Sequence, residues 1–212
     1  MRINVVGGTG YTGHNIVAEA AGRGHTVRSF SRSLPAGPVA AVDYRTGSVF
    51  DPGFQEEAVA DADVVDLTLS PRGELEDVQT ELYGRLAELA DAAGVRLFVI
   101  GGFSTLRPAP GAPRFLEGDL NPVFAKEALS GGANLDLLAS APDSLDWVYV
   151  SPAAAYGAFA PGEATGHYRK GDEVALFDAD GNSAISGADF ARAVVDAIEA
   201  GTDHRAHISF IA

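Results

Sequence analysis

A glycine-rich segment near the start of the chain constrains the fold more than any other feature of the sequence. The residues Gly7-Gly8-Thr9-Gly10-Tyr11-Thr12-Gly13 follow a short β-branched run, 3–6, and open a helical pattern that extends to residue 23. In such a strand–turn–helix unit, one glycine permits the tight turn, a second lets the backbone approach a pyrophosphate, and a third lets helix and strand pack closely. Free N–H groups at the helix N-terminus then hold the anion. The segment predicts dinucleotide binding, and an ordinary strand-to-helix turn is the alternative.

Strand-like and helix-like patterns alternate along the rest of the chain. Strands are expected at 3–6, 26–30, 42–45, 64–69, 95–100 and 147–150, with a short strand at 174–177 and an edge strand at 208–211. Helices are expected at 11–23, 54–60, 74–93, 124–140 and 190–200. The alternation predicts βαβ units and a doubly wound parallel α/β sheet, whose ligand crevice lies at the carboxyl ends of the strands.

The length of the chain limits its organisation. Its 212 residues fit one domain. We therefore expect a single NAD(P)-binding Rossmann domain over residues 1–212, in which 151–186 form a small, irregular C-terminal extension on the substrate side.

Charge and composition exclude several classes of partner. Fifteen Lys and Arg against 29 Asp and Glu give a net charge of −14, which argues against binding to nucleic acid or to an anionic membrane. The absence of cysteine excludes disulfides, thiolate nucleophiles and cysteine-based metal sites. No apolar run approaches the roughly 18 residues of a membrane span, and no signal peptide is recognisable. We expect a cytoplasmic protein, a monomer or small homo-oligomer, that acts on a small molecule.

Competing catalytic motifs are missing. Neither lysine follows a phosphate-binding G-x-x-x-x-G run, and no G-x-S-x-G turn is present. His204 and His207 lack a neighbouring set of Asp, Glu or His that would complete a metal site. We interpret both as surface histidines and expect no metal.

The end of the second strand indicates which cofactor is preferred. A carboxylate expected about 20 residues after the glycine loop would accept the ribose 2′-OH of NAD, but the sequence offers Ser31-Arg32-Ser33 and no acid before Asp43. Arg32 can pair with a phosphate through its planar guanidinium, and Ser31 and Ser33 can donate their hydroxyls. This pattern favours NADP over NAD, and a solvated surface arginine is the alternative.

The glycine segment and three later stretches resemble one known family. The stretches are Leu145-Asp146-Trp147-Val148-Tyr149-Val150-Ser151-Pro152-Ala153-Ala154, Pro161-Gly162-Glu163-Ala164-Thr165-Gly166-His167-Tyr168-Arg169, and Asp180-Gly181-Asn182-Ser183-Ala184-Ile185-Ser186. The chain resembles, over essentially its whole length, the NAD(P)H-binding, NmrA-like branch of the atypical short-chain dehydrogenases. Members of this branch are often labelled NADH-flavin reductases and are related to biliverdin reductase B.

The resemblance implies a reduced nicotinamide cofactor and a set of binding residues. The pyrophosphate would lie on Gly7, Thr9, Gly10, Tyr11, Thr12 and Gly13, the 2′-phosphate on Arg32, and the ribose near Leu69 and Ser70. The nicotinamide would face Gly101, Gly102, Phe103 and Ser104, with Ser151, Pro152, Ala153 and Ala154 on its far side. Three departures stand out: Tyr11 replaces a more polar residue, Ser48 before Val49 replaces an aspartate near the adenine, and Phe103-Ser104-Thr105 replaces a smaller run.

The absence of a tyrosine–lysine pair argues against one class of reaction. None of the six tyrosines is followed four residues later by lysine, so alcohol–ketone interconversion by a Tyr-x-x-x-Lys pair is not expected. Reduction of a flavin or quinone is compatible with this absence, because the protein mainly positions two rings. We expect NADPH-dependent hydride transfer to such an acceptor, with FMN or FAD as a substrate rather than a bound cofactor. Ser104 is the polar group expected beside the acceptor, and a structural serine at a strand end is the alternative. A non-catalytic NADP(H)-binding regulator is the alternative function.

Overall fold

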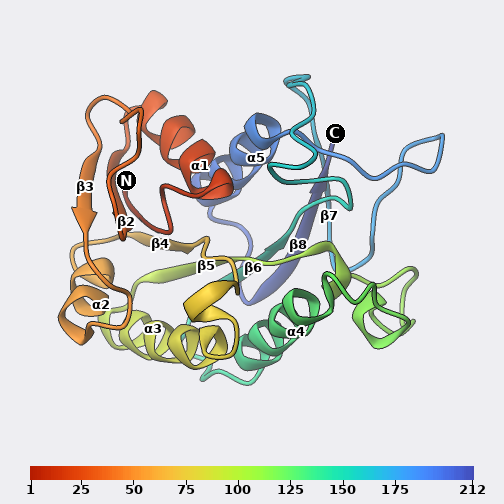
Figure 1. Ribbon diagram of the computed structural model, residues 1–212, viewed down its shortest axis with the longest axis horizontal. Helices are drawn as coiled ribbons and strands as arrows, with labels where there is room; N and C mark the ends of the chain where they lie inside the picture. Colours follow the sequence, from red (N-terminus) through yellow and green to blue (C-terminus); the bar gives the residue numbers. More distant parts are fainter.

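One sheet of eight strands runs through the structure, a computed structural model that describes all 212 residues (Figure 1). The strands lie in the order β3-β2-β1-β4-β5-β6-β8-β7. Their bounds are β1 Arg2–Val6, β2 Thr26–Ser31, β3 Asp43–Thr46, β4 Val64–Leu67, β5 Arg96–Ile100, β6 Trp147–Ser151, β7 Arg169–Gly171 and β8 Ala206–Ile211. All neighbours pair in parallel except β7 and β8. The predicted doubly wound Rossmann fold is confirmed.

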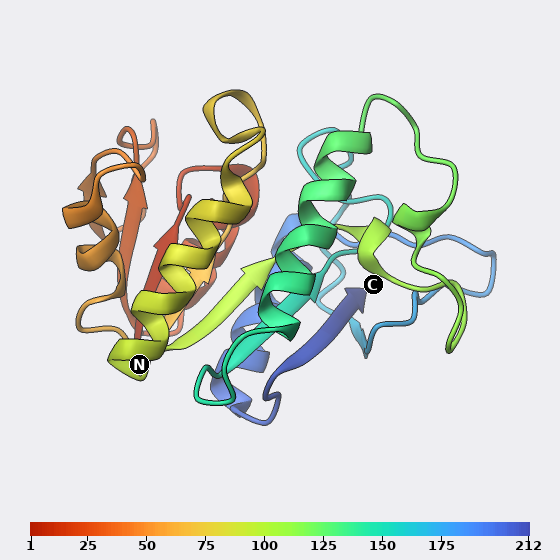
Figure 2. The same cartoon turned by 90° about the horizontal axis from the view of Figure 1, so that it is seen from below.

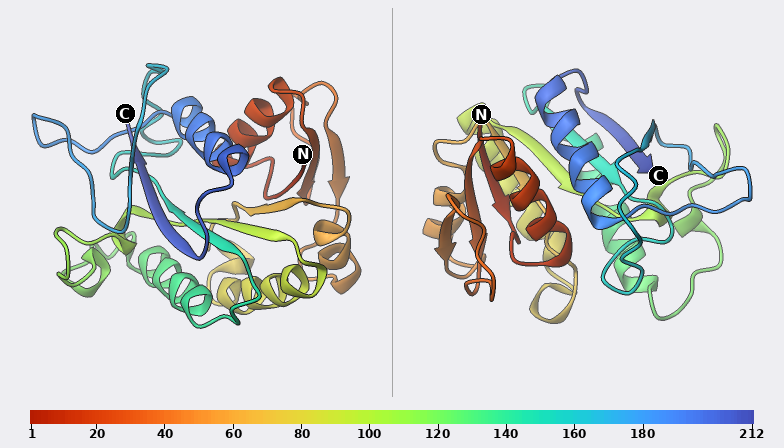
Figure 3. Two further views of the ribbon diagram at one scale, coloured as in Figure 1. Left: turned by 180° about the vertical axis from the view of Figure 1, so that it is seen from behind. Right: turned by 90° about the horizontal axis from the view of Figure 1, so that it is seen from above.

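Five helices cover the two faces of the sheet. They are α1 Tyr11–Gly22, α2 Pro52–Val59, α3 Gln79–Ala93, α4 Ala125–Ala139 and α5 Gly187–Ala200. Seen from above, α1 and α5 lie side by side on one face (Figure 3). Seen from below, α3 and α4 cover the other face, and the parallel strands point toward one common edge (Figure 2). Three short 3₁₀ turns lie among the loops at that edge: η1 Gly73–Leu75, η2 Phe103–Thr105 and η3 Phe115–Glu117.

The alternation of side chains along each strand builds two separate cores. In β6, Val148 and Val150 join the core beneath α1 and α5, whereas Trp147 and Tyr149 join the core beneath α2, α3 and α4. Because both faces are covered, the inner strands are mostly apolar and do not alternate with solvent-facing polar residues; the few polar residues on them, such as Asn4 and Asp66, are buried. This two-sided core fixes the carboxyl ends of β1, β2, β4, β5 and β6, the edge at which this fold is expected to bind its ligand.

The predicted helix at 74–93 begins only at Gln79. The preceding residues form the separate turn η1 and a loop that rises above the sheet edge (Figure 2). Ion pairs join this loop to the start of α4: Arg72 lies 2.7 Å from Glu127, and Glu76 pairs with Lys126. These contacts hold the loop away from the axis of α3, although its sequence has a helical period.

Two predictions about the C-terminal strands are wrong. The short strand expected at 174–177 is replaced by β7, and Val174 makes only an isolated bridge to Arg107. The strand expected at the sheet edge is β8, but it lies between β6 and β7. Both errors have one cause, because a strand that pairs antiparallel with β8 lies within the irregular region and covers its outer edge. Apart from β7, residues 152–186 contain no named helix or strand.

None of the helices combines the length with the apolar composition that crossing a membrane would require.

Candidate cofactor and acceptor site

The glycine loop forms a close strand–turn–helix junction. Gly7 has φ +92°, a left-handed conformation that favours glycine. A Cβ on Gly13 would lie 2.4 Å from the carbonyl oxygen of Gly7 and 2.6 Å from Thr68 Oγ1, so only glycine allows α1 to approach β1 this closely. The N–H groups of Tyr11, Thr12 and Gly13 have no acceptor within the protein. The loop therefore has the shape and the free donors that a pyrophosphate requires.

The side chains of Tyr11 and Thr12 bond to the segment after β6. Tyr11 donates its hydroxyl to the Pro161 carbonyl at 3.4 Å, and Thr12 Oγ1 accepts from the Tyr156 hydroxyl at 2.9 Å. Tyr11 and Tyr156 meet edge to face, and burial raises the pKa of the Tyr156 phenol above its usual range. These contacts leave the backbone amides as the phosphate donors of this turn. They also join the glycine loop to the irregular segment after β6.

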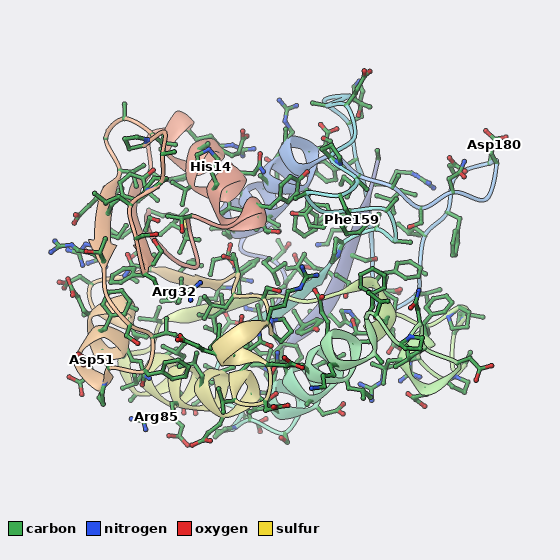
Figure 4. The ribbon with its side chains drawn as sticks, viewed as in Figure 1. His14, Arg32, Asp51, Arg85, Phe159 and Asp180 are labelled. Atoms are coloured by element: carbon green, nitrogen blue, oxygen red, sulfur yellow. The ribbon has the colours of Figure 1, made fainter.

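Arg32 is an exposed residue directly after β2. Its side chain is 79% exposed, and the nearest carboxylate oxygen, on Glu74, lies 3.9 Å away. Figure 4 labels Arg32 in the region where β2 and β4 end. Ser31 is buried and donates its hydroxyl to the Ser33 carbonyl at 3.3 Å, while Ser33 itself is exposed. The guanidinium is thus available to an anion, and the Ser31 hydroxyl is not.

The predicted adenosine side consists mainly of backbone. Ser48 Oγ accepts from the Phe50 amide at 3.2 Å, and Val49 is buried. The Leu69 carbonyl after β4 accepts from Gln79 Nε2 at 2.6 Å and from the Tyr83 hydroxyl at 3.1 Å, while Ser70 is exposed. Two side chains of α3 therefore fix the peptide that would pass near the ribose.

The predicted nicotinamide side is the turn η2, which follows β5. Gly101, Gly102, Phe103 and Ser104 are all partly exposed there. Phe103 stacks on Phe115 with ring centroids 4.9 Å apart. The side-chain hydrogen bonds of this turn are made by Thr105 and not by Ser104, whose side chain is partly exposed. The Ser104 hydroxyl is therefore accessible, and its place beside an acceptor stays a prediction.

At the end of β6, Ser151, Pro152 and Ala153 are buried and Ala154 is exposed. The Ser151 hydroxyl bonds to Thr105 Oγ1 at 2.9 Å and to His207 Nε2 at 2.8 Å. The side chain of Ser151 is therefore directed into the protein, so it is not free to contact a nicotinamide.

The prediction that His207 is a surface histidine is wrong. It lies on β8, partly buried, and meets Tyr149 edge to face at 5.2 Å. Burial lowers the pKa of the His207 imidazole to about 4, so the ring is neutral near pH 7. His204, by contrast, is exposed and bonds to Asp146 at 3.0 Å. The sequence carries no signal for this difference, because it depends on which strand β8 joins.

Asp66 is a second unexpected feature. It lies on β4 beside Val5 and Phe98, fully buried, and neither carboxyl oxygen has a hydrogen-bond partner. Burial alone raises the pKa of this carboxyl to about 8. No group of three or more His, Asp or Glu in the structure could hold a metal ion.

These features define an α/β protein with a glycine-loop site for a dinucleotide. A family model described as NAD(P)H-binding matches residues 7–200. The chain belongs to this NAD(P)H-binding family, which confirms the sequence resemblance.

Three relatives are similar over almost the whole chain. The uncharacterized protein YwnB of Bacillus subtilis is 33% identical over 205 residues, which cover 94% of this chain and 92% of YwnB. A solved Burkholderia pseudomallei structure, provisionally named as an exported protein, is 34% identical with a TM-score of 0.86, and the match covers 100% of both chains. A Streptococcus pneumoniae structure, provisionally named as an NADH-flavin reductase, is 28% identical with a TM-score of 0.85, and covers 100% of this chain and 99% of that one.

Proposed function

We propose that the protein is an NADPH-dependent reductase that transfers hydride to a flavin-like or quinone-like acceptor. One observation carries the proposal: the partly exposed Ser104 lies on the turn after β5, at the same sheet edge as the free amides of the glycine loop. The provisional name of the Streptococcus pneumoniae relative supports the same class of reaction.

When bound, the cofactor supplies a hydride. The chain's residues have three tasks. The amides at the start of α1 bind the pyrophosphate, Arg32 binds the 2′-phosphate, and the η2 turn orients the acceptor with Ser104 beside it. An acceptor that gains two electrons and one hydrogen as hydride takes a further proton from solvent, so no tyrosine–lysine pair is required.

A turnover assay tests the proposal directly. Purified protein mixed with NADPH and menadione, or with NADPH and FMN, is expected to consume NADPH, seen as a loss of nicotinamide absorbance. Consumption should require both the acceptor and the protein. Tight NADPH binding without turnover of any acceptor would reject the reductase and favour the NADP(H)-binding regulator.

Arg32→Gln is expected to weaken NADPH binding by at least about tenfold, because charge-assisted hydrogen bonds to the 2′-phosphate are lost. NADH binding should stay within about twofold, since NADH carries no phosphate at this position. The matched control is Arg85→Gln, which removes the same charge from an exposed position on α3 (Figure 4). Isothermal titration calorimetry with both cofactors measures the difference. An equal loss for NADPH and NADH would refute the role of Arg32.

A further inference from the structure

A chain of hydrogen bonds runs from β8 to the turn after β5. His207 Nε2 lies 2.8 Å from Ser151 Oγ, and Ser151 Oγ lies 2.9 Å from Thr105 Oγ1. Thr105 Oγ1 lies 2.7 Å from the Gly102 carbonyl oxygen. Ser151 and Thr105 are fully buried, so no water competes for their hydroxyls along this path.

Counting protons fixes the direction of every bond in this chain. A carbonyl oxygen only accepts, so the single proton of the Thr105 hydroxyl must lie on the bond to Gly102. Ser151 must then donate its own proton to Thr105. With that proton used, His207 must donate from Nε2 to Ser151. The neutral imidazole is therefore the Nε2–H tautomer, and all three hydrogens point toward Gly102.

The chain of hydrogen bonds ends at the Gly102–Phe103 peptide, at the start of η2. The Gly102 carbonyl also accepts from the Thr105 amide at 3.3 Å, so it is directed into the protein. In a trans peptide the following N–H points the opposite way, and the structure has no cis bonds. The N–H of Phe103 accordingly faces away from the buried chain. Neither it nor the N–H of Ser104 has an acceptor in the protein.

We propose that Thr105, held by Ser151 and His207, is a positioning residue for the acceptor. It fixes the Gly102–Phe103 peptide so that the Phe103 N–H and the Ser104 hydroxyl donate to a carbonyl oxygen of the acceptor. Negative charge develops on that oxygen as hydride arrives, and donors fixed in advance stabilise it. The proposal rests on the proposed reductase function, and it specifies an acceptor whose reduced centre is conjugated to a carbonyl group.

Thr105→Val tests the chain, because it keeps the shape of the side chain and removes its hydroxyl. We expect kcat with menadione to fall by about tenfold, less than the loss for removing an oxyanion donor itself. The Kd for NADPH should stay within about twofold of its wild-type value. Thr105→Ser keeps the hydroxyl and should restore kcat. A Thr105→Val enzyme with unchanged kcat would overturn the positioning role.

A second readout does not depend on turnover. Nitrogen NMR of the His207 ring should show the Nε2–H tautomer in the wild type and in Thr105→Ser. In Thr105→Val, Ser151 loses its acceptor and turns its proton toward Nε2, so the His207 proton should move to Nδ1. A wild-type ring that carries its proton on Nδ1 would overturn the chain as described.

A second pair of variants tests the same hydrogen bonds in case Thr105→Val does not fold. His207→Leu removes the donor at the partly buried end, whereas His207→Gln retains an N–H donor. Amide hydrogen exchange at Thr105 and Leu106 should be faster in His207→Leu than in His207→Gln, and equal rates would contradict the proposal. If the wild-type protein reduces no acceptor, the reductase function is rejected. The tautomer and exchange measurements would still show whether the hydrogen bonds from His207 to Gly102 exist as described.

Discussion

Gly13→Ala is expected to reduce the affinity for NADPH by about a hundredfold or more. The new Cβ would lie 2.4 Å from the Gly7 carbonyl oxygen and 2.8 Å from the Gly7 carbonyl carbon. These are backbone atoms, so no side-chain rotation relieves the overlap, and α1 must move away from β1. That movement displaces the amides of Tyr11, Thr12 and residue 13 from the positions in which they hold phosphate. The overpacking should also lower the free energy of unfolding by about 1–3 kcal/mol.

The matched control lies on the same helix. A Cβ on Gly22 would meet no atom within 4 Å, and its φ is not positive. Gly22→Ala should therefore bind NADPH as the wild type does and be at least as stable. Calorimetric titration and urea unfolding compare the two variants. NADPH binding by Gly13→Ala within a few-fold of wild type would disprove the close-approach argument.

Asp66→Val is expected to stabilise the protein at alkaline pH and to remove a large pH dependence. The folded carboxyl has a pKa of about 8, raised from 3.8 by burial. Between these values the folded state keeps a proton that the unfolded chain has released. Wild-type stability should therefore be fully present below pH 4 and fall toward pH 8, by up to about 1.4 kcal/mol per pH unit. Valine fits a strand and brings no buried charge, so Asp66→Val should exceed wild type by at least about 2 kcal/mol at pH 8.

Urea unfolding at intervals from pH 4 to pH 8 measures this effect as the difference between variant and wild type. Asp66→Asn separates charge from polarity: it should lose the pH dependence but remain less stable than Asp66→Val, since its amide is still buried without partners. Asp143, a fully exposed aspartate, provides the control, and Asp143→Asn should retain the wild-type pH dependence. If the free energy of unfolding depends on pH in the same way for Asp66→Val and wild type, Asp66 is not the source of the pH dependence.

The sequence predicted features that depend on local geometry. The glycine loop was predictable because a left-handed φ at Gly7 and a close approach at Gly13 are requirements of single residues. The position of Arg32 followed from the order of strands, and the structure places it exposed at the end of β2, although its contact with a phosphate stays a prediction.

Features that depend on long-range pairing were not predictable. His207 was interpreted as a surface residue, because nothing in its neighbours indicates that β8 lies between β6 and β7. Its bond to Ser151 joins residues on two strands whose partnership the pattern does not encode. Asp66 is similar, since an aspartate in a short strand is compatible with a solvent-facing position. Only the packing of α1 and α5 over that face shows that it is buried.

The two edge strands of the sheet determine whether it can pair with a strand of another molecule. Both edge strands are short and charged: β3 contains Asp43 and Arg45, and β7 contains Arg169 and Lys170. The strands between them are mostly buried, and an uncovered edge of such a strand would template pairing with another chain and lead to aggregation. A three-residue strand beside β8 thus shields the last buried strand. The charged, three-residue β7 therefore occupies the edge of β8 that would otherwise be open to another chain.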